Sequence, residues 1–210
     1  MAIVEKKPPI KETVGAQFVC FSVMSDGDWT DKFEEEVEKT ETVKSVKVTE
    51  NSEGTDIYAS GKVYDTDYNQ ASTDVEVEVI AFPAATRAKM RGETVNEGGL
   101  VLSGGNGVRP YFAYGKVVKL KKNEVRFEWF PKCKLASNSD EVKTREASFS
   151  EQTDTMTIKA YPFDDAGNCK TYVETSIKFP DGLTEEKFFS KPILTQEDLT
   201  AVLSAAQTTE

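Results

Sequence analysis

Four oxygen-bearing side chains between residues 65 and 76 have the spacing of a calcium-binding loop. They stand at positions one, three, five and twelve of such a loop: Asp65, Asp67, Asn69 and Glu76. Position six, however, is Gln70, where the sharp turn of the loop needs glycine. The flanking residues also alternate as strands do, instead of forming two helices. The pattern therefore favours a polar hairpin connection over a calcium site.

A glycine-rich stretch, GLVLSGGNGVRPYFAYG from Gly99 to Gly115, could in principle cradle a phosphate. A phosphate loop of this kind needs Lys and then Ser or Thr, whereas Gly105 and Asn106 occupy those positions. A dinucleotide site needs a strand that leads into a helix, but here the loop leads into alternating aromatic residues. We therefore expect a glycine turn, which tolerates positive φ at no steric cost, followed by a core strand.

The chain offers little for acid–base or nucleophilic catalysis. It contains no histidine, so the commonest general base is absent and no Ser or Cys has its usual partner. Asp164 and Asp165 form an adjacent acid pair, which could work as general acid and base. They lie in the turn-forming stretch DDAGN, where full solvation would leave their pKa values ordinary. We expect no catalytic residue, no metal and no cofactor.

The three cysteines, Cys20, Cys133 and Cys169, are far apart and odd in number. Without a Cys-x-x-Cys pair they indicate neither a zinc site nor a disulfide framework. Buried, reduced thiols are typical of a protein made in a cytoplasm. The start of the chain, MAIVEKKPPI, lacks the apolar run of a signal peptide. No window approaches the ~20 apolar residues that span a membrane, so we expect no membrane contact.

Charge is unevenly distributed along the 210 residues, whose net charge is −10. Residues 1–80 carry 8 Lys and 18 Asp or Glu, residues 81–134 carry 11 Lys or Arg and 4 Glu, and residues 135–210 carry 7 Lys or Arg and 14 Asp or Glu. The acidic balance argues against a simple nucleic-acid-binding module. A basic block between two acidic ones could serve head-to-tail contact between identical subunits. It could equally reflect surfaces that interleave when the chain folds.

Period-two alternation of apolar and polar residues dominates the chain and predicts strands with two distinct faces. In VRFEWFPKCKL, residues 125–135, the apolar residues from Val125 through Trp129 and Cys133 to Leu135 share one parity. Pro131 cannot donate to a ladder, so we expect a break, a bulge or an edge there. Four further stretches read as strands: DIYASGKVY, DVEVEVIAF, TMTIKAYPF and TYVETSIKF. The DDAGN turn would join the last two, and KKNE, residues 121–124, is a similar turn.

Eight residues of these strands are predicted to fill the core. They are Val75, Val77, Val79, Phe112, Tyr114, Val125, Phe127 and Trp129. The aromatic residues could instead stack nucleic-acid bases, as in single-strand binders. Core filling is favoured, because most of these residues follow one parity of their own strand.

Few segments carry helix signals. PAATRAKMRG has Pro83 at a helix start and Gly92 at its stop. Near the end of the chain, Thr195 and Asp198 form a variant of the capping box ahead of an apolar stripe. The acidic stretch TDKFEEEVEKT, residues 30–40, fits either a short helix or a long loop.

The order of these parts resembles the major tail protein (tail tube protein) of long-tailed bacteriophages. The resemblance covers residues 40–165 and rests on DIYASGKVYD, FPAATRAKMRGETV, RPYFAYGKVVKLKKNEVRFEWFPKCKL and TREASFSEQTDTMTIKAYPF, in that order. It implies a β-sandwich of two antiparallel sheets with a flanking short α-helix. With the patterns above, we expect extended arms, a C-terminal helix and a single domain over residues 1–210, with an N-terminal arm at 1–13 and a C-terminal extension at 181–210.

The same resemblance implies a structural virion protein without cofactor or catalysis. Its copies would self-assemble into hexameric rings that stack into a tail tube, a conduit for DNA delivery. The implied partners are further copies of the chain, the tape measure, tail terminator and distal tail proteins, and double-stranded DNA in transient, non-specific passage. Such a protein is made in the bacterial host cytoplasm and resides in the phage tail.

Two sets of charged residues are candidates for roles in such a tube. Asp74, Glu76 and Glu78 share one face of a strand whose valines point the other way. They could line the lumen or form an ordinary solvated outer face, since alternation alone does not say which solvent a face meets. The basic candidates for contacts between subunits are Arg87, Lys89, Arg91, Lys119, Lys121 and Lys122.

Two functions from other classes compete with a tail tube. A soluble β-sandwich binding module for a receptor or a carbohydrate would be a monomer or a small closed oligomer with an exposed aromatic platform. A hydrolase with paired carboxylates would lose activity on a single Asp or Glu change. No convincing carboxylate pair stands out in the sequence.

Overall fold

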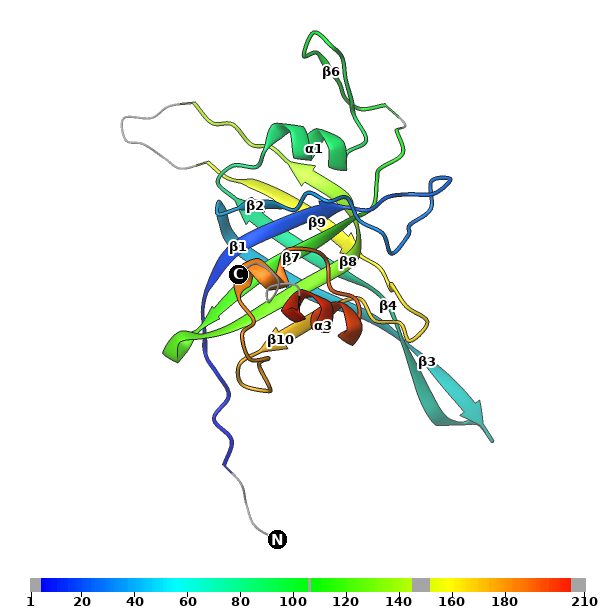
Figure 1. Cartoon of the computed structure of the whole chain (residues 1–210). Coiled ribbons are helices and arrows are strands. Elements are labelled where there is room, and N and C mark those ends of the chain that lie inside the picture. The colour runs from blue at the N-terminus through cyan, green and yellow to red at the C-terminus, as the bar shows by residue number, and fades with distance from the viewer. Residues whose placement is uncertain (1–4, 106, 145–151, 205–210) are drawn as a thin grey trace.

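The computed structural model describes residues 5–105, 107–144 and 152–204. Its sheets are antiparallel and its helices are few and short (Figure 1), which confirms the prediction of a mainly β protein. The strands are β1 (Lys11–Phe21), β2 (Glu38–Thr40), β3 (Val43–Ala59), β4 (Lys62–Val79), β5 (Thr94–Val95), β6 (Val101–Leu102), β7 (Phe112–Leu120), β8 (Glu124–Ser139), β9 (Asp154–Ala160) and β10 (Thr171–Glu174). The helices are α1 (Ala84–Met90), the 3-10 turn η1 (Lys121–Asn123), α2 (Glu185–Phe188) and α3 (Gln196–Ser204).

Most of the strands belong to one continuous sheet with the order β2-β1-β7-β8-β9-β4-β3. The long strand β8 pairs with β7 along one edge, while its other edge is shared by β10 and β9. Because β3 and β1 are also in contact, the sheet bends until β4 and β9 face β1, β7 and β8 across a core. The expected sandwich therefore arises from one curved sheet, with β5 and β6 as a small separate hairpin.

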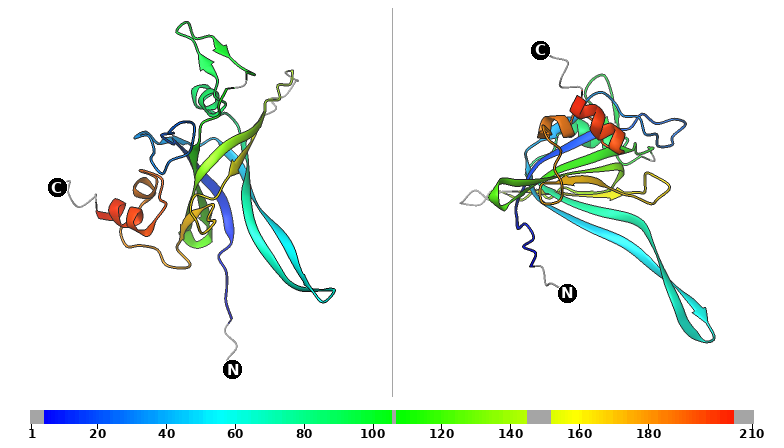
Figure 2. Two further views of the ribbon diagram at one scale, coloured as in Figure 1. Left: turned by 90° about the vertical axis from the view of Figure 1, so that its right-hand side faces the viewer. Right: turned by 60° about the horizontal axis from the view of Figure 1, so that its bottom comes forward.

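The strands β3 and β4 form a hairpin of 17 and 18 residues that projects from the sandwich (Figures 1 and 2). At its tip, Ser60 and Gly61 have φ of 52° and 74°, as a type I′ turn requires. We expected DIYASGKVY to be one strand and residues 65–76 to be a polar hairpin connection. Both interpretations are wrong, because the turn lies at Ser60–Gly61 and residues 65–76 belong to β4.

The first core fills the interior of the sandwich. Val75 and Val77 of β4 point inward and meet Phe112 and Tyr114 of β7, all four being fully buried. Met90, at the end of α1, is buried against the same cluster. The flanking helix therefore closes one end of the sandwich, as Figure 1 shows.

A second core covers the opposite face of β1, β7 and β8. The C-terminal segment with α2 and α3 lies on this face (Figure 2). Phe189 stacks on Phe18 of β1 with 3.8 Å between the ring centroids, and the Trp129 indole donates a hydrogen bond to the Phe188 carbonyl at 3.1 Å. The expected C-terminal extension is thus an integral part of the packing, since it covers apolar residues that would otherwise face water.

The strand β8 contributes to both cores because it changes face beside Pro131. Between Phe130 and Cys133 it has one more residue than the paired stretch of β7, which defines a β-bulge. Trp129 lies in the second core, whereas Cys133 and Leu135 lie in the first. Of the break, bulge or edge expected at Pro131, the structure shows a bulge, and the expectation that Trp129, Cys133 and Leu135 share one face is wrong.

The helix ends follow the signals in the sequence. Pro83 is the N-cap residue of α1. Gly92 follows the last turn of the helix with φ of 66°, and a Cβ on this residue would lie only 2.5 Å from the Val108 carbonyl oxygen. Before α3, the Asp198 amide donates to the Thr195 hydroxyl at 3.2 Å, and the Thr195 amide donates to the Asp198 carboxylate at 3.0 Å. Residues 30–40 form a loop that ends in β2, so the helical alternative for them is wrong.

A network of charged side chains is buried between β7, β8 and β10. Lys116 Nζ lies 2.7 Å from Glu128 Oε2, and the two side chains are only 8% and 6% exposed. Arg126 lies 3.4 Å from Glu128 and also donates to Glu174. Burial alone would raise the pKa of Glu174, but hydrogen bonds from Ser176 and Arg126 lower it below its ordinary value. Glu174 therefore stabilises the fold at pH values above the pKa that it has in the unfolded chain. This contribution is lost as the pH falls through the lower pKa that it has in the folded chain.

Gly115 of β7 allows the C-terminal segment to approach the sheet. A Cβ at this position would lie 2.8 Å from the Phe189 ring and 2.9 Å from the Trp129 ring. We expect Gly115→Ala to lower the free energy of unfolding by about 1–3 kcal/mol, because overpacking forces rings and backbone apart. Urea denaturation followed by tryptophan fluorescence measures this change.

Gly98 provides a matched control for that substitution. A Cβ there would meet nothing within 4 Å, so Gly98→Ala should change the stability by less than about 0.5 kcal/mol. Equal effects of the two substitutions would contradict the role given to Gly115.

Candidate assembly surfaces

The glycine-rich stretch and the DDAGN stretch, which we considered as a phosphate loop and an acid pair, form turns in the folded chain. Gly99 has φ of 82° and lies in the turn between β5 and β6, after which the chain leads into the buried aromatic residues of β7. The turn at DDAGN is confirmed, with the Gly167 amide donating to the Asp164 carbonyl at 3.1 Å. We expected an ordinary pKa for Asp164, and this expectation is wrong. Hydrogen bonds from the Asn168 side chain and backbone lower the pKa of Asp164.

The described residues contain neither a metal-binding cluster nor a membrane-spanning helix. Within residues 5–105, 107–144 and 152–204, no group of three or more His, Cys, Asp or Glu side chains could hold a metal ion. No helix in the same ranges has the length and apolar character needed to cross a bilayer.

The eight residues predicted to fill the core lie in or beside the two clusters. Seven of them are buried: Val75, Val77, Val79, Phe112, Tyr114, Phe127 and Trp129. Val125 is partly buried at the edge of the second core. The aromatic residues of β7 and β8 are therefore unavailable as an exposed platform for bases or sugars.

The acidic candidates Asp74, Glu76 and Glu78 lie together on the face of β4 that points away from the valine core. Each carboxylate accepts a hydrogen bond from a neighbouring strand or loop: Asp74 from Asn51 at 2.8 Å, Glu76 from Lys47 at 3.3 Å and Glu78 from Thr153 at 3.0 Å. Hydrogen bonds of this kind keep the carboxylates fixed on the sheet surface.

Lysines flank this acidic row on the neighbouring strands. Lys47 is paired with Glu76 across β3 and β4, and Lys159 of β9 stands opposite Asp74. The face therefore carries an acidic stripe between cations, a feature that the sequence of β4 alone did not reveal. Partial compensation of this kind reduces, without cancelling, the negative potential above the stripe.

The six basic candidates divide into two groups. Arg87, Lys89 and Arg91 on and after α1 form ion pairs within the chain, with Asp154 at 3.2 Å, Glu34 at 2.7 Å and Glu93 at 3.0 Å. The other three, Lys119, Lys121 and Lys122, are exposed at the tip of the β7–β8 hairpin, and none forms an ion pair with a described residue. This second group has charge free for contacts with another molecule.

The tip of the β7–β8 hairpin belongs to a basic end of the molecule. Lys11 at the start of β1 pairs with Leu120, and the Lys121 amide donates to the Ile10 carbonyl at 2.9 Å. Residues 5–10, which precede β1, are mostly exposed and form no strand. The cations of this end are Lys6, Lys7, Lys11, Lys119, Lys121 and Lys122, and the anions beside them are Glu5, Glu12 and Glu124.

The opposite end of β1 is acidic. The loop of residues 22–37 follows β1 and is fastened to its last residue, since the Glu34 amide donates to the Phe21 carbonyl at 2.9 Å. The loop contains one cation, Lys32, and the anions Asp26, Asp28, Asp31, Glu34, Glu35 and Glu36. The eleven residues of β1 separate the two ends by roughly 33 Å at ~3.3 Å per residue.

The tip of the β3–β4 hairpin exposes a cluster of apolar side chains. The exposed fractions are 50% for Ile57, 68% for Tyr58, 51% for Val63 and 80% for Tyr64. Sequence reasoning missed this surface, although the Ser60–Gly61 dipeptide between alternating residues is a turn signal that could have revealed it. Contiguous exposed apolar residues mark sites of protein contact.

Comparison with known proteins identifies the family. The model of the family described as phage tail tube protein matches residues 33–192, well over half of the 210 residues. A search of curated proteins found no match. The matched range includes the long hairpin, α1, β7, β8 and α2, but it begins after β1 and ends before α3, both of which contribute residues to the cores. The chain therefore belongs to the phage tail tube protein family.

Proposed function

We propose that copies of this chain assemble into hexameric rings that stack into the phage tail tube and that DNA passes through the tube on its way into the host cell. The family has a structural role in the virion tail and forms a tube together with other tail components. The hexameric ring, the conduit for DNA and the absence of catalysis are the parts that we add. In the same proposal, the ends of the tube meet the tape measure, tail terminator and distal tail proteins.

The observation that carries this proposal is the projecting β3–β4 hairpin (Figure 2). Only residues 73–79 of β4 are paired with β9, so the outer part of the hairpin is a two-stranded ribbon. A two-stranded ribbon is marginally stable in water, and this one ends in exposed Tyr58 and Tyr64. Docking on a neighbouring copy would bury the tyrosines and support the ribbon.

The different charges of the two ends of β1 support stacking in one direction. A contact between a basic end and an acidic end joins two different surfaces of the same chain. Such heterologous contacts generate rings or open filaments instead of closed dimers. A tube made of rings needs contacts of this type along its axis.

Negative-stain electron microscopy of the purified protein tests the proposal. We expect rings and tubes of about 10 nm width, since six domains of this size surround a channel at that scale. A protein that stays monomeric or forms small closed oligomers at all concentrations would contradict the proposal and favour a binding module.

Reversal of the free cations at the basic end should hinder stacking. Lys121→Glu with Lys122→Glu removes two cations that pair with no described residue. Each exposed pair is worth about 0–1 kcal/mol, but a ring repeats the contact in every subunit. We expect shorter tubes, with the largest effect at low salt, where charges are least screened.

Neutralisation provides the matched control. Lys121→Gln with Lys122→Gln should give tubes of intermediate length, because it removes the attraction without adding repulsion. Tubes of normal length from the double Glu variant at low salt would exclude a stacking role for this tip.

The acidic stripe of β4 lines the channel in our proposal. DNA has to pass a long wall quickly, and every cation on the wall would attract the phosphate backbone. Asp74, Glu76 and Glu78 repel phosphate instead and keep water and counterions between wall and duplex. The flanking Lys47 and Lys159 weaken this repulsion without cancelling it, so the stripe still makes the wall a low-affinity surface for DNA.

Replacing Asp74, Glu76 and Glu78 with lysine should slow DNA ejection, while Asn and Gln in their place should have a smaller effect. The rate of ejection from virions that carry each variant is the measurement. A structure of the assembled tube in which these carboxylates point outward would refute the assignment. Normal ejection by the lysine variant would refute the mechanism even if the carboxylates line the channel.

A further inference from the structure

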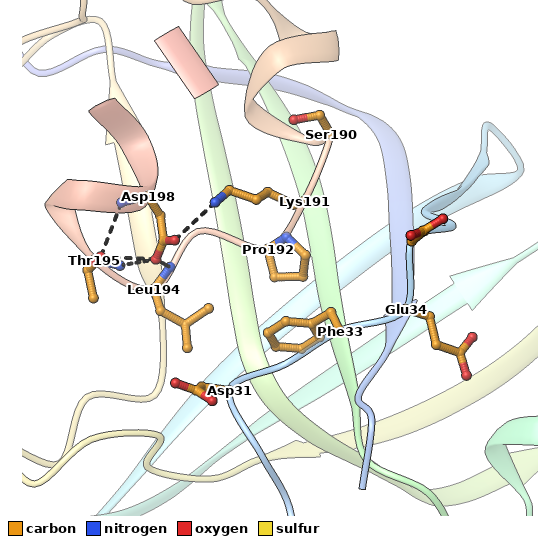
Figure 3. A pocket seen from close by; sticks show the side chains of 10 residues that line it. Asp31, Phe33, Glu34, Ser190, Lys191, Pro192, Leu194, Thr195 and Asp198 are labelled. Carbon is orange, nitrogen blue, oxygen red and sulfur yellow. Dashed lines mark hydrogen bonds and ion pairs between the residues drawn. The ribbon is translucent and has the colours of Figure 1, made fainter. Parts of the chain in front are cut away.

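A pocket lies between the acidic loop of residues 22–37 and the C-terminal segment. Its volume is about 460 Å³. Figure 3 shows Phe33 from the loop facing Pro192 and Leu194 from the segment, with Asp31 at the rim. Glu35 completes the acidic side of the pocket. Aromatic and proline side chains with carboxylates beside them are suited to an apolar, extended ligand that carries cations.

The charges around the pocket divide into satisfied and free ones. Lys191 forms an ion pair with Asp198 at 3.1 Å, so both charges are satisfied. Burial alone would raise the pKa of Asp198, but hydrogen bonds from Lys191 and Thr195 lower it. Glu34 is paired with Lys89 outside the pocket. Asp31 and Glu35 are exposed and form no ion pair with any residue that the structure describes. The pocket therefore presents two free carboxylates beside three apolar side chains, those of Phe33, Pro192 and Leu194.

The N-terminal arm carries the complementary chemistry. Its described part, residues 5–10, reads EKKPPI. Lys6 forms no ion pair with a described residue, and Lys7 lies 3.9 Å from Glu5 with both side chains more than 80% exposed. Consecutive prolines favour a polyproline II conformation, which docks on aromatic and proline surfaces with little loss of entropy.

The arm cannot occupy the pocket of its own chain. It begins at the basic end of β1, whereas the pocket lies at the acidic end, roughly 33 Å away at ~3.3 Å per residue. Five residues from Ile10 back to Lys6 reach at most about 18 Å when fully extended. An occupant with this sequence must come from another molecule.

We propose that the Lys6–Ile10 segment of one copy docks in the pocket of the next copy along the tube. The two prolines lie on Phe33 and Pro192, and the two lysines face Asp31 and Glu35. The contact joins the basic end of one copy to the acidic end of the next, in the head-to-tail sense that a stack requires. This inference rests on the proposed function, since it needs copies of the chain to stack.

Complementary charge reversal tests this contact. One variant carries Lys6→Glu and Lys7→Glu, and the other carries Asp31→Lys and Glu35→Lys. All four residues are exposed, so the subunit fold should persist, which circular dichroism verifies. Each variant alone should need about a tenfold higher concentration to assemble, because like charges meet at every contact. An equimolar mixture should assemble at nearly the wild-type concentration, since each arm can then find a pocket of opposite charge.

A matched control separates this contact from net charge. Asp28→Lys with Glu36→Lys makes the same change in net charge on the same loop, but neither residue lines the pocket. Sedimentation of assembled material against concentration should show a smaller defect for this control than for Asp31→Lys with Glu35→Lys, because Asp28 and Glu36 carry charge at the acidic end but lie outside the pocket. An equal defect in the control, or a mixture that fails to recover assembly, would overturn the inference.

The outcomes also distinguish this inference from the proposed function. If the wild-type protein assembles and the arm variant assembles at the same concentration, the docking is refuted while the tube role stands. If the wild-type protein never assembles, the tube role fails and the docking fails with it.

Discussion

Replacing Glu128 with alanine is expected to lower the free energy of unfolding by about 3–5 kcal/mol. The substitution leaves Lys116 buried without the carboxylate that lies 2.7 Å from its ammonium group. Arg126 also loses a partner, although it retains Glu174. An uncompensated charge in a side chain that is only 8% exposed is far more costly than the loss of a surface ion pair. Urea denaturation of the subunit measures the change.

Two further variants sharpen this prediction. Glu141 forms an ion pair with Lys143 at the same kind of distance, 3.3 Å, but both side chains are about 70% exposed. Glu141→Ala should therefore change the stability by at most about 1 kcal/mol. Replacing both members of the buried pair, Lys116→Met with Glu128→Leu, should recover much of the loss, because no buried charge remains unpaired between them. A loss below about 1 kcal/mol for Glu128→Ala would contradict the network described here.

Removing the two exposed tyrosines of the β3–β4 tip is expected to weaken assembly strongly. Tyr58→Ser with Tyr64→Ser leaves both cores untouched, because the side chains are 68% and 80% exposed in the subunit. If they are anchors in a neighbouring copy, their loss should cost roughly 2–3 kcal/mol per contact, which raises the concentration needed for assembly about a hundredfold. Sedimentation and electron microscopy of the variant show whether rings and tubes still form.

Tyr172 on β10 supplies a control of the same residue type. It is 47% exposed but lies outside the hairpin tip. Tyr172→Ser should leave assembly near the wild-type level, and thermal unfolding should show that all three serine substitutions preserve the subunit fold. Tubes formed normally by the double hairpin variant would mean that the projecting tip has no part in assembly.

Local signals in the sequence predicted the local structures well. Pro83 and Gly92 mark the ends of α1, and the Thr195 and Asp198 side chains cap α3 as their spacing indicated. The bulge beside Pro131 follows from its missing amide hydrogen, which leaves a gap in any ladder. In each case the chemistry of one or two residues restricts the local backbone, so the structure there can be predicted without knowledge of distant parts of the chain.

Features that depend on distant parts of the chain were harder to predict. Alternation in β7 and β8 cannot show that a C-terminal segment covers their second face, since Phe188 and Phe189 are far away in sequence. The β3–β4 hairpin was missed because its strands are polar in the middle, where residues 65–76 resembled a loop. Polar residues are tolerated there because most of this stretch pairs only with β3 and lies outside the sandwich.

The candidate surfaces were predictable only in part. The sequence located the acidic row of β4 and the free cations at the β7–β8 tip, but it grouped the latter with Arg87, Lys89 and Arg91. Those three are occupied by carboxylates from other segments, which no local pattern reveals. The separation of basic and acidic ends likewise depends on β1 holding the arm and the acidic loop apart.

Electron cryomicroscopy of tubes assembled from the purified chain tests the central claim most directly. Our account predicts rings of six copies around an open channel, with the acidic stripe of β4 on the channel wall and the β3–β4 tip buried against a neighbouring copy. A closed oligomer without a channel wide enough for duplex DNA, or the absence of any ordered assembly, would contradict it.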